Sequence, residues 1–110
     1  MPDTQPVVVV AVFVPRPGKR DEVEAAVRNA VAATHADDRG CELYAAHESI
    51  RGREGIVIIE KWASAEELQM HGSGKAFADL TAAVGDLLAE PLDVTVLKPI
   101  PAGDPKLGAL

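Results

Sequence analysis

The sequence has little of the chemistry that builds disulfides or metal centres. It contains a single cysteine, Cys41, among 110 residues. One cysteine allows no intramolecular disulfide, provides no cysteine-type zinc site and fits a reducing compartment. The three histidines are scattered without the close spacing of metal ligands. We therefore expect no metal, and stability that comes from a hydrophobic core.

Membrane-spanning and secretory segments are also lacking. The apolar run Val7–Val14 is eight residues long, whereas a bilayer-spanning helix needs about 20 apolar residues and a signal peptide needs basic and cleavable flanks. The net charge of −6 disfavours nucleic acid and anionic membranes as partners. We expect a cytoplasmic protein with no membrane and no nucleic-acid partner.

Sequence motifs for bound cofactors are missing as well. The segment 72–75, GSGK, has a faint likeness to a phosphate-binding loop. That loop requires a glycine where Gln69 stands and a serine or threonine where Ala76 stands. No dinucleotide fingerprint follows the first apolar run, and no serine lies in a nucleophile elbow. We expect catalysis, where there is any, to use side chains alone and no cofactor.

The residues that are present are typical of one globular domain. Apolar residues make up 47% of the chain and charged residues 25%, which are ordinary proportions for a domain of this size. We predict a domain over residues 1–99. Residues 100–110 form a tail too rich in proline and glycine for regular structure.

Hydrophobic patterns predict the element order β-α-β-β-α-β. The strands are expected at Val7–Val14, Cys41–Ile50, Ile56–Trp62 and Leu92–Lys98, the first helix from Lys19 to about Ala36, and a broken second helix at Ser64–Met70 and Ser73–Leu88. This order predicts a ferredoxin-like α+β sandwich, in which an antiparallel four-stranded sheet carries two helices on one face.

Two local signals mark the ends of the predicted helices. The segment Asp37–Gly40 closes the first helix, and Gly40 is available for a left-handed turn. Ser64 and Glu67 have the spacing of a capping box at the start of the second helix.

The predicted sheet has an uncovered face. Val7–Val14 and Ile56–Ile59 are apolar on both faces of their strands, yet the two helices cover only one face. No other predicted element is available to cover the second face. We predict a face-to-face homodimer, with the proline-rich tail reaching over the partner.

The candidate site lies where the third strand meets the broken helix. Strand alternation places Glu60 and Trp62 on one face, although the pattern alone leaves open which face meets the helices. If this face does, His71 can close over it, and a His71–Glu60 pair is a candidate general base. Tyr44 and Phe77 would then extend the aromatic wall of a cavity between the sheet and the helices. The structural alternatives are core packing for the aromatic residues and a purely structural His–Glu pair.

The other two histidines are weaker candidates. His47, on the second predicted strand, is an alternative base. His35 ends the first predicted helix, where an imidazole can interact with free carbonyl groups.

Several motifs in their order resemble the antibiotic biosynthesis monooxygenase (ABM) domain. They are Pro17-Gly18 after the first apolar run, Gly40-Cys41 with Tyr44 at the second predicted strand, Ile59–Trp62, and Ala65–His71. The resemblance spans about Val7 to Pro99. It implies a dimeric α+β barrel and oxidation of a phenolic or quinol-type aromatic molecule by O₂, without metal or flavin.

The resemblance also implies roles for individual residues. His71 would be the base or proton shuttle, Glu60 its orienting partner, and Trp62 and Tyr44 the aromatic wall. Related haem-degrading enzymes would need an asparagine near Val10–Val12 and a histidine near 77–79, and this chain has neither. Haem degradation is therefore disfavoured.

Three hypotheses of function remain open from the sequence. The first is a cofactor-independent monooxygenase acting on a polycyclic or quinol-like aromatic. The second is a non-catalytic, small-ligand-binding or stress-associated dimer. The third is an isomerase or decarboxylase that uses the same His–carboxylate pair without oxygen.

Overall fold

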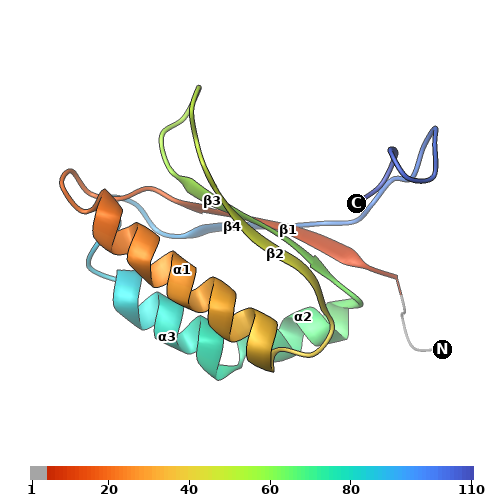
Figure 1. The fold of residues 1–110 in the computed structure, drawn as a ribbon, viewed down its shortest axis with the longest axis horizontal. Coiled ribbons are helices and arrows are strands. Elements are labelled where there is room, and N and C mark those ends of the chain that lie inside the picture. Colours follow the sequence, from red (N-terminus) through yellow and green to blue (C-terminus); the bar gives the residue numbers. More distant parts are fainter. Residues whose placement is uncertain (1–4) are drawn as a thin grey trace.

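The computed structural model describes residues 5–110. The elements in chain order are β1 (Val7–Phe13), α1 (Arg20–Asp37), β2 (Cys41–Glu48), β3 (Ile56–Trp62), α2 (Ala65–Gly72), α3 (Lys75–Val84) and β4 (Asp93–Leu97). The four strands form one antiparallel sheet in the order β2-β3-β1-β4, and the helices lie on one side of it (Figure 1). The predicted ferredoxin-like α+β fold and the broken second helix are confirmed.

The largest difference from the predicted boundaries is at the end of α3. The sequence predicts a helix that continues to Leu88, but α3 ends at Val84. The following residues pair instead with the segment after β1, because Ala89 N–H donates to the Val14 carbonyl at 2.7 Å and Arg16 N–H donates to the Leu87 carbonyl at 2.8 Å. Backbone pairing with this segment therefore replaces the last helical turn.

The core forms between the helices and the inner face of the sheet. In β3, burial alternates strictly, with Ile56, Ile58, Glu60 and Trp62 buried and the residues between them half-buried. Glu60 pairs with Val9 of β1 across the sheet, and Val9 is also buried. The face that carries Glu60 and Trp62 is therefore the face that meets the helices, which the sequence pattern alone left open.

The outer face of the sheet is apolar and carries no helix. Val10 and Val12 of β1 and Val57 and Ile59 of β3 point to this side and are half-buried, while all three helices lie on the opposite side (Figure 1). Residues 98–110 form neither helix nor strand, and Leu107 in this tail is 88% exposed. No helix among residues 5–110 is long and apolar enough to span a bilayer.

A tight turn at Gly40 joins α1 to β2 and lies against the segment that precedes α2. Gly40 adopts the predicted left-handed conformation, with φ of +80°, and its carbonyl accepts from Ala63 N–H at 2.9 Å. Ser64 caps α2 by accepting from Glu67 N–H at 3.2 Å. The Glu67 side chain lies against Gly40, where an added Cβ would come within 2.5 Å of Glu67 Cγ. The turn therefore needs glycine for its backbone conformation and for space.

Comparing two glycine substitutions separates these requirements. Gly18 has the same φ of +80° but open space around it, so Gly18→Ala should cost only the left-handed strain of about 1–2 kcal/mol. Gly40→Ala should lower the free energy of unfolding by roughly 1–3 kcal/mol more, because overpacking adds to the strain. Urea unfolding of both variants measures the difference. Equal losses would show that the Gly40–Glu67 contact has no energetic role.

Candidate active site

An inner cavity of about 180 Å³ lies between the sheet and the helices α2 and α3. Its polar groups are Glu60 and His71, and Tyr44 and Phe77 belong to its aromatic wall. Val94 and Val96 of the edge strand β4 also line the cavity and are 47% and 56% exposed, so the cavity opens towards the β4 edge. Four of the five predicted site residues thus surround one apolar hollow.

Trp62, the fifth predicted residue, lies behind the cavity wall and does not line it. Its side chain is fully buried, and its indole Nε1–H donates to Glu60 Oε1 at 2.9 Å. Its ring centroid is 4.6 Å from that of His71. Trp62 therefore supports both polar groups of the cavity from behind.

His71, on α2, is held by a carboxylate that the sequence pattern did not single out. Its Nδ1 lies 2.5 Å from Asp38 Oδ2, and its side chain is 3% exposed. The other ring nitrogen, Nε2, is buried and has no hydrogen-bond partner among residues 5–110. The sequence predicts Glu60 as the partner of His71, but in the structure the partner is Asp38. The hydrogen bond between Gly40 and Ala63 holds the end of α1 next to α2, which brings Asp38 within reach of His71.

Glu60 is a buried carboxyl group in apolar surroundings, with 4% of its surface exposed. Burial raises its pKa above the ordinary value, while the hydrogen bond from Trp62 and the proximity of His71 act in the opposite direction. The raised pKa favours the protonated, neutral form. A neutral carboxylic acid can donate a hydrogen bond to a ligand, as well as accept one.

Three aromatic rings surround the imidazole of His71. The ring centroids of Trp62, Tyr44 and Phe77 lie 4.6, 5.4 and 5.6 Å from it. Burial, followed by the charge of Glu60, raises the pKa of the Tyr44 phenol, so Tyr44 keeps its proton and acts as wall. Among the residues that line the cavity, His71 is the one with a buried nitrogen, Nε2, that has no hydrogen-bond partner within residues 5–110.

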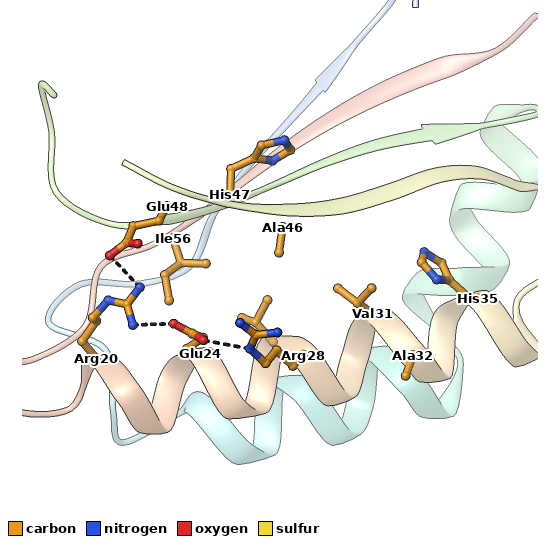
Figure 2. Close-up of a pocket in the computed structure, with 11 residues that line it drawn as sticks. Arg20, Glu24, Arg28, Val31, Ala32, His35, Ala46, His47, Glu48 and Ile56 are labelled. Carbon is orange, nitrogen blue, oxygen red and sulfur yellow. Dashed lines mark hydrogen bonds and ion pairs between the residues drawn. The ribbon is translucent and has the colours of Figure 1, made fainter. Parts of the chain in front are cut away.

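His47 and His35 lie outside the inner cavity. Both line a larger groove of about 430 Å³ between α1 and β2, where His47 points away from α1 (Figure 2). His35 Nε2 is 2.9 Å from the Tyr44 carbonyl oxygen, so it bonds to the β2 edge, whereas the sequence predicts an interaction with carbonyl groups at the helix end.

The charged side chains of this groove are paired with one another. Arg20 forms ion pairs with Glu24 and Glu48, and Arg28 Nε lies 2.8 Å from Glu24 Oε2 (Figure 2). The groove is larger than the inner cavity, but its positive and negative side chains are paired with one another. Within residues 5–110, no group of three or more His, Cys, Asp or Glu side chains is arranged to hold a metal ion.

Comparison with known proteins places this chain in one family. The sequence model of the antibiotic biosynthesis monooxygenase family matches residues 6–83, and the chain belongs to this family. A Mycobacterium tuberculosis protein named "Putative monooxygenase Rv0793" is 38% identical over 97 residues, which cover 88% of this chain and 94% of that protein.

Solved structures agree with this assignment. The structure of Rv0793 has a TM-score of 0.82 at 33% identity, covering 91% of this chain and 100% of that one. A Caulobacter crescentus protein bearing the same family name has a TM-score of 0.80 at 26% identity, covering 89% of this chain and 93% of that one. At the level of the family, the protein is thus a monooxygenase-type domain.

The protonation of Glu60 predicts a pH-dependent stability. Because burial raises its folded-state pKa above the ordinary value of 4.5, Glu60 stabilises the fold fully below that ordinary value. This contribution is lost as pH rises from the unfolded-state pKa to the folded-state pKa. The loss is about 1.36 kcal/mol for each pH unit in that interval. Glu60→Gln, which keeps an acceptor for Trp62 and carries no charge, should be more stable than the wild type at about pH 8 and should flatten the slope.

Urea unfolding between about pH 4 and pH 8 tests this expectation. Glu54→Gln is the matched control, because Glu54 is exposed in the β2–β3 hairpin and its substitution removes the same charge. If Glu60→Gln keeps the wild-type slope and gains nothing at the upper pH, burial does not raise the pKa of Glu60.

Proposed function

We propose that this protein is a cofactor-independent monooxygenase that oxidises a phenolic or quinol-type aromatic molecule with O₂ in the inner cavity. The family membership supports the reaction class. The observation that carries the proposal is His71, which is buried among aromatic rings with Nε2 unpartnered within residues 5–110. A single nitrogen of this kind in an apolar cavity suits the removal of one proton from a flat, apolar substrate.

The proposed reaction begins with proton transfer from the substrate hydroxyl to His71. The resulting phenolate is electron-rich and transfers an electron to O₂, and the two radicals then combine at a ring carbon that carries a hydrogen. His71 returns its proton to the peroxide anion that forms. Loss of water from the peroxide leaves a carbonyl group. Overall, a phenol with a free ring C–H becomes a quinone, one atom of O₂ enters the product and the other leaves as water. The substrate supplies all four electrons.

The other residues of the site have supporting roles in this proposal. Glu60, whose pKa is raised by burial, donates a hydrogen bond to a substrate oxygen. Tyr44 and Phe77 contact the faces of the aromatic ring, and Trp62 holds Glu60 in place. The apolar walls exclude water, which protects the radical pair from side reactions.

The size of the cavity narrows the substrate class. A cavity of roughly 150 Å³ is known to take up benzene, and this one has about 180 Å³. One-ring substrates therefore fit the enclosed part. A polycyclic substrate would have to extend past Val94 and Val96 at the β4 edge, where the cavity opens.

Oxygen uptake with phenols and hydroquinones of one, two and three fused rings tests the proposal. We expect turnover of the smaller members, with one atom of isotopically labelled O₂ in the product. His71→Ala should lower the rate by at least about a hundredfold, since a general base contributes roughly 10²–10⁴. His47→Ala is the control, because His47 lies outside the inner cavity.

Other results would favour the alternative functions. Equal rates for both histidine variants would remove His71 from the mechanism. A phenol that raises the melting temperature but is recovered unchanged would indicate a binding protein. Product formation under strict anaerobiosis would indicate an isomerase or decarboxylase.

We further propose that the protein acts as a cytoplasmic homodimer that pairs through the outer face of the sheet. The single cysteine supports a reducing compartment. Val10, Val12, Val57 and Ile59 make this face apolar, and the helices lie on the other side (Figure 1). A second copy of the same face is the occupant that this surface fits.

A charge on the outer face should separate the two copies. We expect Ile59→Glu to give a monomer in light scattering at micromolar concentration, because a carboxylate would be buried without a partner. Met70→Glu is the control, since Met70 is 57% exposed on α2, on the helix side. A wild-type protein that is already monomeric would contradict the dimer.

A further inference from the structure

Asp38 lies at the end of α1, yet its side chain belongs to the cavity site. Its backbone N–H caps α1 by donating to the Thr34 carbonyl at 3.0 Å. Its side chain is 15% exposed and lies 2.5 Å from His71, which is 33 positions later in the chain. The end of α1 and the helix α2 lie side by side (Figure 1). A helix-ending residue is thereby placed against the proposed base.

Asp38 is also close to the start of α3. An added Cβ at Gly74, the N-cap of α3, would lie 3.8 Å from Asp38 Oδ1. The N-terminus of a helix carries a partial positive charge that favours a carboxylate nearby. The two carboxyl oxygens therefore have separate roles, because Oδ1 faces the helix start and Oδ2 faces His71.

The hydrogen bond determines where the imidazole proton resides. A carboxylate has only acceptor positions, so the Nδ1 atom of His71 must donate. A neutral imidazole has one N–H, and its other nitrogen then carries a free lone pair. In His71 that nitrogen is Nε2, which is buried and unpartnered within residues 5–110.

Among residues 5–110, no other group around His71 has a hydrogen bond to its ring. Glu60 is engaged by the indole N–H of Trp62, and the rings of Trp62, Tyr44 and Phe77 contact the imidazole through their faces and edges. The titratable groups facing His71 are Asp38, Glu60 and Tyr44. Of these, Asp38 has the hydrogen bond to the ring.

We propose that Asp38 is the positioning residue of this site: it holds the Nδ1–H of His71 and so leaves Nε2 as the acceptor for a substrate proton. The inference rests on the base role proposed above for His71. It gives Asp38 the orienting role that the family resemblance implied for Glu60. Glu60 remains available to contact the substrate oxygen.

Nitrogen NMR of the full chain, with labelled histidine at about pH 8, tests the proposal without a substrate. The His71 signals are assigned by their loss in His71→Ala. In the wild type we expect a protonated Nδ1 and a bare Nε2. In Asp38→Asn the side-chain amide can donate to Nδ1, so the proton should move to Nε2, as the equivalent change does in a serine-protease triad.

Two further variants separate this role from charge and folding. Asp38→Glu keeps a carboxylate, so a substantial share of the His71 side chains should still carry the proton on Nδ1. Asp37→Asn removes the same charge from the neighbouring, exposed residue and should leave both nitrogen signals unchanged. With a turned-over phenol, Asp38→Asn should lower oxygen uptake by about 10–100-fold, and Asp37→Asn should not.

The possible outcomes separate the two proposals. A wild-type His71 that carries its proton on Nε2 would overturn the positioning role, even if Asp38→Asn fails to fold. An unchanged tautomer in folded Asp38→Asn would also overturn it. A reversed tautomer with unchanged oxygen uptake would support the positioning role and refute His71 as the base.

Discussion

The burial of two ionisable side chains between sheet and helices is the constraint on which the site depends. An imidazole or carboxyl group in an apolar layer is costly unless it is hydrogen-bonded or neutral. His71 meets this requirement through Asp38. Glu60 meets it through Trp62 and through a raised pKa. Each polar group of the cavity therefore has its own partner, and the two remain separate groups that can act on one ligand.

The Gly40 turn connects this constraint to the fold. Its left-handed backbone reverses the chain directly after α1. The Gly40 carbonyl accepts a hydrogen bond from the N–H of Ala63, which directly precedes the α2 cap, Ser64. The end of α1 and the start of α2 are thereby fixed to each other. Asp38 lies beside this contact at the end of α1, and His71 lies in the last turn of the short helix α2. The placement of α2 against the end of α1 therefore supports the hydrogen bond between them.

Local patterns predicted much of this structure, and the remainder depends on long-range contacts. Alternation in Ile56–Trp62 predicted that Glu60 and Trp62 share a face, and the spacing of Ser64 and Glu67 predicted the helix start; both are confirmed. The Asp38–His71 pair spans 33 positions, and an aspartate at a helix end is ordinary as a sequence signal. Its tertiary partner has no periodic signature, and the family resemblance implied the orienting role for Glu60 instead.

The separation of Glu60 from His71 gives the cavity two complementary hydrogen-bonding groups. In the proposed arrangement, a protonated Glu60 is the donor, and His71, whose Nδ1–H is held by Asp38, is the acceptor at Nε2. A phenolic hydroxyl can donate its proton to the second while its oxygen accepts from the first. Asp38 does not line the cavity, but its bond to Nδ1 leaves Nε2 as the unpartnered nitrogen of His71 among residues 5–110.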